Sequence, residues 1–158
     1  MSWPITLLVG GSAAGLTAFL NQFVLSPLLQ SWHIAETQTV SLTSLHGNLP
    51  GLLFLLLVTW PLAAVMEEMV FRGYLLNRIL NFTGRSEMAV GAALLFSSLF
   101  FSLAHGNYTI GFLLTSFSMG LLEGGLYLAF KSNLWISIIT HGTANTITLL
   151  LAFWGFVG

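Results

Sequence analysis

Two adjacent glutamates lie in the middle of an apolar stretch of the chain. Glu67 and Glu68 interrupt a hydrophobic run that begins at Leu52, and Arg72 follows the second glutamate by four residues. A carboxylate at membrane depth costs about 2.5–3.5 kcal/mol on insertion scales unless it is paired or hydrated. Ionisable groups at such a depth face the protein interior and mark a pathway or a reaction centre. We therefore expect the chemistry of this protein to be centred on these two glutamates.

Helical geometry gives the two glutamates different surroundings. Neighbouring residues on a helix point about 100° apart, so Glu67 and Glu68 cannot share one face. Glu68 and Arg72, at positions i and i+4, do share a face and are expected to pair. The pair would neutralise Glu68 and leave Glu67 free to act as a general base. These three residues alone are equally compatible with a purely structural polar cluster.

Two histidines of the apolar segments favour a functional interpretation. His105 ends one segment and His141 lies within another. Phe101 lies one helical turn before His105, and Asn145 lies one turn after His141. A carboxylate base, two imidazoles and an amide donor are the parts needed for hydrolysis of an acyl group by water.

Composition places this chemistry in a membrane. Hydrophobic residues make up 56% of the chain and charged residues 6%, against roughly 25% charged residues in soluble domains. We expect a multi-pass integral membrane protein, of a bacterial or archaeal plasma membrane. The net charge of -1 offers no basic patch for a nucleic acid. The absence of cysteine and aspartate excludes a cysteine nucleophile and an aspartyl dyad, and no serine stands out with a histidine partner.

The apolar segments predict an all-α bundle of five membrane-spanning helices. They cover about residues 3–30, 52–80, 88–105, 110–130 and 134–157. We interpret residues 1–158 as one membrane domain, with a first span at 1–30, a polar loop at 31–49 and a catalytic core at 50–157. His33 and His46 are expected to be ordinary loop residues. Pro61 predicts a kink or local opening one turn before the glutamates.

Basic residues and glycines give the expected orientation and packing. Arg78, Arg85 and Lys131 would lie on one side of the membrane, which predicts a cytoplasmic N-terminus. Gly120, Gly124 and Gly125 form a small-xxx-small pattern that favours close helix packing, and the glycine-rich faces of the first and fourth helices permit a homo-oligomer. Straight vertical helices would place the glutamates and histidines at depths that differ by about two turns. Tilt, the Pro61 kink and unequal entry depths of the helices would close this difference.

Three motifs in order resemble the signature of the CPBP family. They are Glu67-Glu68-x-x-x-Arg72, Phe101-x-x-x-His105 and His141-x-x-x-Asn145. The resemblance extends over roughly residues 50–150. That family groups CAAX prenyl proteases, bacteriocin-processing enzymes and Abi-type proteins, which are intramembrane endopeptidases described as glutamic.

The resemblance implies a role for each motif residue. Glu67 would be the base that activates a water, and His105 would help to hold that water. His141 and Asn145 would stabilise the oxyanion of the tetrahedral intermediate, while the second glutamate and the arginine of the first motif support the site. No cofactor is implied. Zinc held by histidine and glutamate ligands is an alternative, which chelator sensitivity with metal-specific rescue would favour, although no HExxH motif occurs.

The expected substrate is a membrane-proximal or lipid-anchored peptide or protein. Its identity does not follow from the sequence. Two non-enzymatic alternatives stay open: a small proton-coupled transporter subunit, whose ionisable residues would line a path, and a scaffold or immunity protein.

Glu123 has no place in the three motifs, and we expect it to be a hydrogen-bonded structural carboxylate or to face a hydrated cavity.

Overall fold

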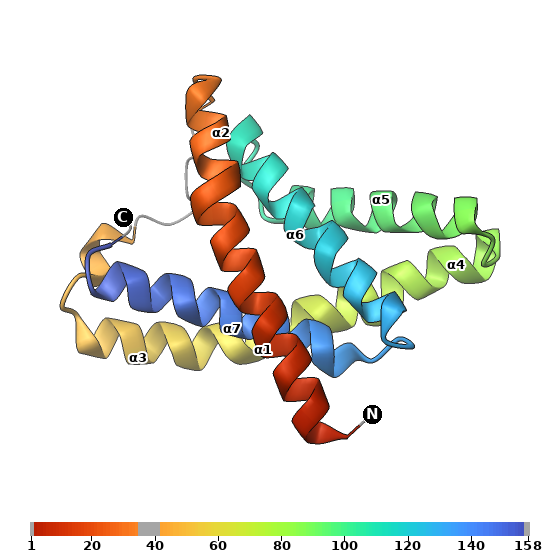
Figure 1. Cartoon of the computed structure of the whole chain (residues 1–158), viewed down its shortest axis with the longest axis horizontal. Coiled ribbons are helices and arrows are strands. Elements are labelled where there is room, and N and C mark those ends of the chain that lie inside the picture. The colour runs from red at the N-terminus through yellow and green to blue at the C-terminus, as the bar shows by residue number, and fades with distance from the viewer. Residues whose placement is uncertain (1, 35–41, 157–158) are drawn as a thin grey trace.

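The computed structural model describes residues 2–34 and 42–156, and the regular elements in this part of the chain are all helices, joined by turns and short loops (Figure 1). The elements are α1 (Trp3–Leu20), η1 (Asn21–Leu25), α2 (Ser26–Ser31), η2 (Thr43–Leu45), α3 (Leu49–Val58), η3 (Thr59–Glu67), η4 (Met69–Leu76), α4 (Asn77–Thr83), α5 (Glu87–Ala104), α6 (Ile110–Ala129) and α7 (Leu134–Phe153). The segments η1, η3 and η4 are π-helical, and η2 is a 3₁₀ turn. Within the predicted polar loop, residues 35–41 lie outside the described part.

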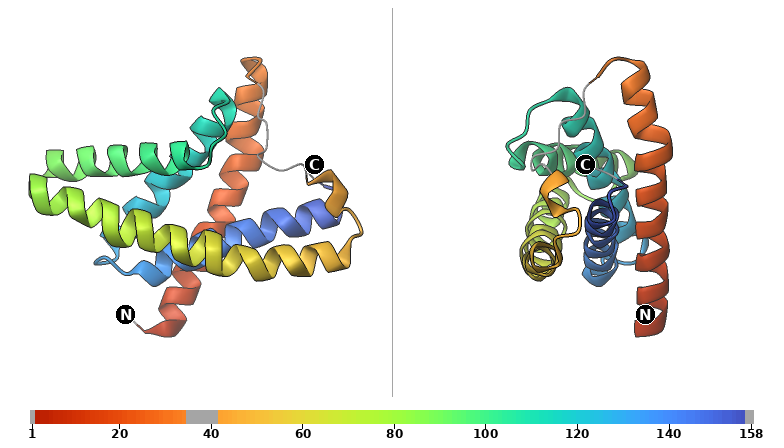
Figure 2. Two further views of the ribbon diagram at one scale, coloured as in Figure 1. Left: turned by 180° about the vertical axis from the view of Figure 1, so that it is seen from behind. Right: turned by 90° about the vertical axis from the view of Figure 1, so that its left-hand side faces the viewer.

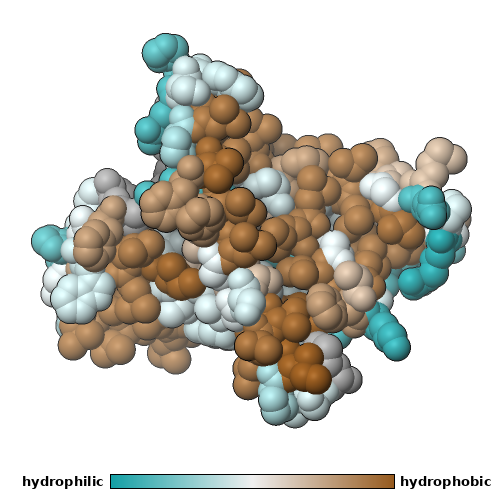
Figure 3. All heavy atoms as spheres, in the orientation of Figure 1, coloured by the Kyte–Doolittle hydropathy of each residue, from teal (hydrophilic) through white to brown (hydrophobic). Residues whose placement is uncertain are grey.

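Five helical runs are long and apolar enough to cross a membrane, as the sequence predicts. They are Trp3–Ser31, Leu49–Thr83, Glu87–Ala104, Ile110–Ala129 and Leu134–Phe153. Large apolar side chains stay exposed along all five runs, and in Figure 3 apolar atoms cover most of the visible face, with hydrophilic atoms gathered toward its ends. Lipid, not water, suits such a surface.

The second span forms the long axis of the molecule. It runs for 35 residues, well beyond the roughly 20 needed to cross the hydrocarbon core. Its middle is π-helical, and the first π segment begins at Thr59, two residues before Pro61. The predicted local opening at Pro61 is therefore confirmed. A proline lacks the N–H of a regular helix, which removes one hydrogen bond of the α pattern at this point.

Helices α5 and α7 lie along opposite halves of the second span. Helix α7 packs on α3 and η3, and α5 packs on η4 and α4 (Figure 2). The end of α5 and the middle of α7 therefore both reach the centre of the second span, where the glutamates lie. Tilt and offset of the helices bring these segments together, which straight vertical helices would not do.

Glycines allow the close contact between α5 and α6. A Cβ atom on Gly120 would lie 2.9 Å from the Cβ of Ser98 and 3.0 Å from its Cα. One on Gly124 would lie 2.8 Å from Leu94, whereas one on Gly125 would meet open space. The predicted packing role of Gly120 and Gly124 is thus confirmed inside the chain itself.

Helix α1 crosses the outer side of α7 at a steep angle (Figure 1). Gly10 makes the contact, because a Cβ there would lie 2.7 Å from a methyl group of Ile139. The hydroxyl of Thr140 donates to the carbonyl of Gly10 at 3.3 Å. A Cβ on Gly11 or Gly15 would meet nothing within 4 Å among the described residues, so Gly10 alone of these three glycines needs its small size for packing.

Candidate active site

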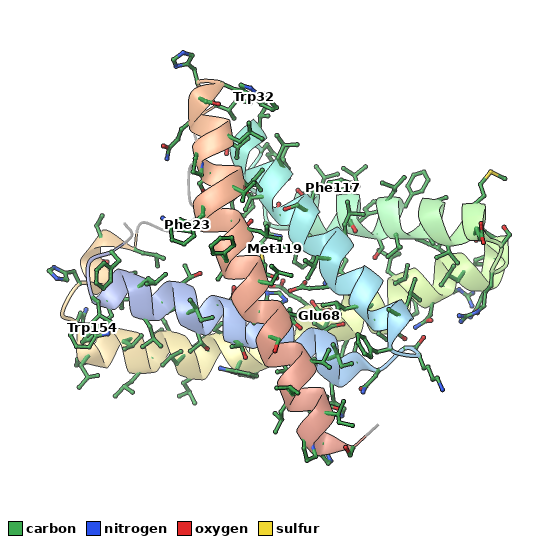
Figure 4. The ribbon with its side chains drawn as sticks, in the orientation of Figure 1. Phe23, Trp32, Glu68, Phe117, Met119 and Trp154 are labelled. Carbon is green, nitrogen blue, oxygen red and sulfur yellow. The ribbon has the colours of Figure 1, made fainter. Side chains whose placement is uncertain are left out.

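A buried ion pair lies near the centre of the molecule, where Figure 4 labels Glu68. Nη1 of Arg72 donates to Oε1 of Glu68 at 2.5 Å, and the two side chains are only 1% and 0% exposed. The predicted pairing of Glu68 with Arg72 is confirmed. A charge without a partner at this depth would be strongly unfavourable, so the pair accounts for the position of both groups.

Glu123 on α6 belongs to the same buried cluster. Its Oε2 forms an ion pair with Nη2 of Arg72, at a distance of 3.0 Å. The same nitrogen donates a hydrogen bond to the carbonyl of Gly120 at 3.2 Å. The ring of Phe101 covers the guanidinium, 4.5 Å from its carbon to the ring centre. Sequence reasoning left Glu123 out of the site. The available signal was a glutamate flanked by Gly120 and Gly124, whose small size lets α6 approach the cluster.

His141 joins the cluster through one ring nitrogen. Its Nδ1 lies 2.9 Å from Oε1 of Glu68 and 3.8 Å from Oε2 of Glu123. An ionised carboxylate only accepts hydrogen bonds, and the same oxygen already accepts from Arg72. Nδ1 of His141 must therefore carry the proton and donate. Its imidazole is 4% exposed, and it also lines the neighbouring cavity.

Two polar side chains, one on α5 and one directly after the π segment in the same span, satisfy backbone carbonyls of the second π segment. Ser97 donates to the carbonyl of Phe71 at 3.1 Å. The amide of Asn77 donates to the carbonyls of Arg72 and Gly73 at 3.0 and 2.9 Å. Buried carbonyls without partners would be unfavourable, so these bonds stabilise the wide helical turn that carries Arg72.

Glu67 points away from the buried cluster and into a cavity of about 390 Å³. The cavity is lined by Leu42, Ala63, Glu67, Phe101, His105, Phe112, Thr115, Ser116, Met119, His141 and Asn145. The side chain of Glu67 is 31% exposed, and its Oε2 receives no hydrogen bond from the described residues. The two neighbouring glutamates thus have separate environments, as helical geometry predicts.

His105 faces Glu67 across this cavity. Its Nε2 lies 3.7 Å from Oε2 of Glu67, too far for a direct hydrogen bond. Its Nδ1 lies 2.8 Å from the carbonyl of Phe101. A carbonyl only accepts, so Nδ1 carries the proton, and in the neutral ring Nε2 presents a lone pair toward Glu67.

The structure brings the predicted site residues together in two adjoining places. Glu67, His105, His141 and Asn145 line one cavity, while the Glu68–Arg72 ion pair lies behind it and holds His141. A larger cavity of about 650 Å³ lies around Trp3 and Lys131, and neither a carboxylate nor a histidine of the described residues lines it. The smaller cavity is therefore the candidate active site.

Three of these groups form a set that could hold a metal ion. One donor atom each from Glu68, Glu123 and His141 lie within 4.8 Å of one another, all buried. Both carboxylates, however, already bind the guanidinium of Arg72. Nδ1 of His141 points its proton, not a lone pair, at Glu68. The donor set therefore fits Arg72 as its cation and does not fit zinc in the arrangement described.

A polytopic helical membrane protein with a carboxylate, two imidazoles and an amide around one cavity has the make-up of an intramembrane hydrolase. Residues 49–147 match the family of type II CAAX prenyl endopeptidases, Rce1-like. The match covers more than half of the chain, so the chain belongs to this family of membrane proteases, and the resemblance seen in the motifs is confirmed. Helix α1 lies outside the matched residues. Neither a curated protein nor a solved structure matches the chain.

Proposed function

We propose that this chain is an intramembrane endopeptidase that uses a glutamate-activated water to cut a membrane-proximal or lipid-anchored peptide. The observation that carries the proposal is the pairing of Glu67 with His105 across the cavity, with Oε2 and Nε2 3.7 Å apart. A substrate water between these two atoms would be within hydrogen-bond reach of both. Membership of the Rce1-like family gives independent support.

Both atoms that face this water position are acceptors. Oε2 of Glu67 is a carboxylate oxygen, and in the neutral ring of His105 Nε2 is an acceptor because Nδ1 donates to Phe101. The two hydrogens of the water would therefore point at Glu67 and His105, and an oxygen lone pair would be left for the peptide carbonyl. This arrangement holds the nucleophile in one orientation.

The reaction then needs one proton acceptor and one oxyanion site. Glu67 takes a proton from the water as its oxygen bonds to the carbonyl carbon, and the carbonyl oxygen becomes negatively charged. His141 and Asn145 line the same cavity and would donate hydrogen bonds to that oxygen. When the C–N bond breaks, the proton on Glu67 passes to the leaving amine, which restores the carboxylate.

The walls of the cavity suit a peptide that carries apolar groups. Ala63, Phe112 and Met119 form part of the lining, and large apolar side chains are exposed along all five helical runs. The family description names CAAX prenyl endopeptidases. We therefore choose an internally quenched fluorescent peptide with a prenylated cysteine three residues from its C-terminus as the first probe, beside the same peptide without the prenyl group.

The decisive variant is Glu67→Gln, measured on the purified protein in proteoliposomes. It keeps the size of the side chain and removes the base, so cleavage of the prenylated probe should fall by about 10²–10⁴-fold. The melting temperature should stay at that of the unmodified chain, because Glu67 makes no ion pair with the cluster. Equal turnover in the variant and the unmodified protein would end the protease assignment.

Glu68→Gln is the matched control one residue away. It leaves Arg72 and the proton of His141 Nδ1 without their shared carboxylate oxygen. Breaking a buried pair from one side destabilises by about 3–5 kcal/mol. We expect a lower yield and a lower melting temperature from this variant, in contrast to Glu67→Gln. If the two variants lost stability and activity to the same degree, the separate roles of the glutamates would be wrong.

A further inference from the structure

The buried cluster behind the cavity holds more negative than positive charge. Glu68 and Glu123 are two carboxylates at 0% exposure, and the guanidinium of Arg72 is the one permanent cation between them. A buried net charge is strongly unfavourable, so the cluster needs one additional proton. His141 is the neighbouring group that can hold it, since its Nδ1 lies 2.9 Å from Glu68 and 3.8 Å from Glu123.

The proposed chemistry needs the same proton. Nδ1 of His141 is used as a donor to Glu68, so in a neutral ring Nε2 would be an acceptor only. A developing oxyanion is also an acceptor, and a neutral His141 would repel it. His141 stabilises an oxyanion in the cavity only when both ring nitrogens carry protons.

We propose that Glu123 is a positioning residue of the active site, whose carboxylate holds His141 in the doubly protonated form that donates from Nε2. The inference rests on the proposed function for its catalytic consequence. With both carboxylates ionised, Arg72 and a charged His141 balance them, and the buried cluster is neutral. Without the second carboxylate, the charges of Glu68 and Arg72 cancel, and the cluster is neutral when His141 is uncharged.

The other charged groups near His141 do not replace Glu123. Glu67 shares the cavity but faces His105, and His105 donates from Nδ1 to a backbone carbonyl. Helix α1, which packs on the other side of α7, contains no ionisable side chain between Trp3 and Leu20. Glu123 is therefore the group that sets the excess negative charge.

A competing location for the proton is the pair of carboxylates itself. Oε2 of Glu68 and both oxygens of Glu123 receive no hydrogen bond from the described residues, so one carboxyl could hold the proton. The variant Glu123→Gln separates the two cases. Glutamine mimics a protonated Glu123 in shape and charge. If the proton resided on Glu123, the variant would therefore leave the charge state of His141 and the activity unchanged.

The first measurement is the kinetics of Glu123→Gln and Glu123→Asp with the quenched prenylated peptide in proteoliposomes. We expect Glu123→Gln to lower kcat by about 10²-fold or more with little change in KM, as for loss of one oxyanion donor. Glu123→Asp keeps the charge and should recover part of the loss. Full activity in Glu123→Gln would overturn the proposal, and so would an equal loss in Glu123→Asp.

The second measurement reads the proton directly and does not need activity. The four histidines are labelled with ¹⁵N, and His141 is assigned from its missing signals in His141→Asn. In the unmodified protein both ring nitrogens of His141 should show protonated shifts, and in Glu123→Gln only Nδ1 should. The signals of His105 serve as the control for intact structure, since Phe101 fixes its Nδ1 in both proteins.

The two measurements separate failure of this inference from failure of the proposed function. A bare Nε2 in the unmodified protein would overturn the role of Glu123 even if the prenylated peptide is cleaved. A doubly protonated His141 that becomes neutral in Glu123→Gln would support that role even if the prenylated peptide is not the substrate.

Discussion

At the scale of single residues, the same side chain does different work because its neighbours differ. Glu67 and Glu68 are adjacent in sequence, yet one faces a cavity and the other is fully buried against a guanidinium. The two histidines both donate from Nδ1, one to a carbonyl and one to a carboxylate. The first partner is neutral and the second belongs to a charged cluster, so the two Nε2 atoms offer different chemistry to the cavity.

Asn145 gives a test of the oxyanion site that does not involve charge. Asn145→Ala removes an amide from the cavity lining and leaves the buried cluster intact. We expect kcat for the quenched prenylated peptide to fall by about 10²–10³-fold, with an unchanged melting temperature. A large rise in KM at constant kcat would show instead that Asn145 binds the peptide and does not stabilise the oxyanion.

The sequence predicts most of the site at this scale and misses its charge balance. Pairing of Glu68 with Arg72 follows from their spacing, and the exposure of Glu67 follows from the 100° step between neighbours. The sequence could not assign Glu123 to the site, because its partners lie on other segments. The register between α6 and the second span does not follow from the sequence of either segment. The three motifs in order indicate the family, but they do not predict the role of a residue outside them.

At the scale of elements, the central span is adapted to the site by its π-helical turns. Pro61 predicted an opening, but the π segments are also stabilised by donors outside them, Ser97 on α5 and Asn77 at the start of α4. Such segments are uncommon and are found most often at functional sites. Here they carry Glu67 and Arg72, and Glu68 lies at the junction between the two segments.

The close approach of α5 and α6 is testable through two glycines on one helix. Gly120→Ala should destabilise the protein by about 1–3 kcal/mol, because the new Cβ would meet the backbone of Ser98. Activity should fall as well, since the carbonyl of Gly120 accepts from Arg72.

Gly125→Ala is the matched control for this contact, because its Cβ would meet open space. A glycine-to-alanine change in a helix gains up to about 1 kcal/mol, so the control should be neutral or slightly stabilising. Thermal unfolding in detergent measures both variants. Equal stability of the two would mean that α5 and α6 are farther apart than the structure has them.

At the scale of the whole molecule, the second span is the long axis, and α5 and α7 pack along its two halves. The matched family region, residues 49–147, contains the axis and all three motifs. Helix α1 is added on the outside, where Gly10 fits against Ile139. Apolar composition predicted five spans, and it did so correctly. It could not predict their tilt, because tilt is set by packing between helices and not by the length of an apolar stretch.

The orientation of this bundle remains a prediction, and the cysteine-free sequence makes it simple to test. The loop between α4 and α5 and the loop between α6 and α7 lie at the same end of the molecule (Figure 1). These loops contain Arg85 and Lys131, and the bias of basic residues toward the cytoplasm places that end inside. Single variants Arg85→Cys and Lys131→Cys should resist a membrane-impermeant thiol reagent in intact cells and react after permeabilisation.

Ser44→Cys, in the exposed turn at the opposite end, should react in intact cells. The unmodified chain provides a background without any thiol. If Arg85→Cys and Lys131→Cys reacted on opposite sides of the membrane, the number of spans between them would be wrong. If both reacted in intact cells and Ser44→Cys did not, the bundle would be inverted.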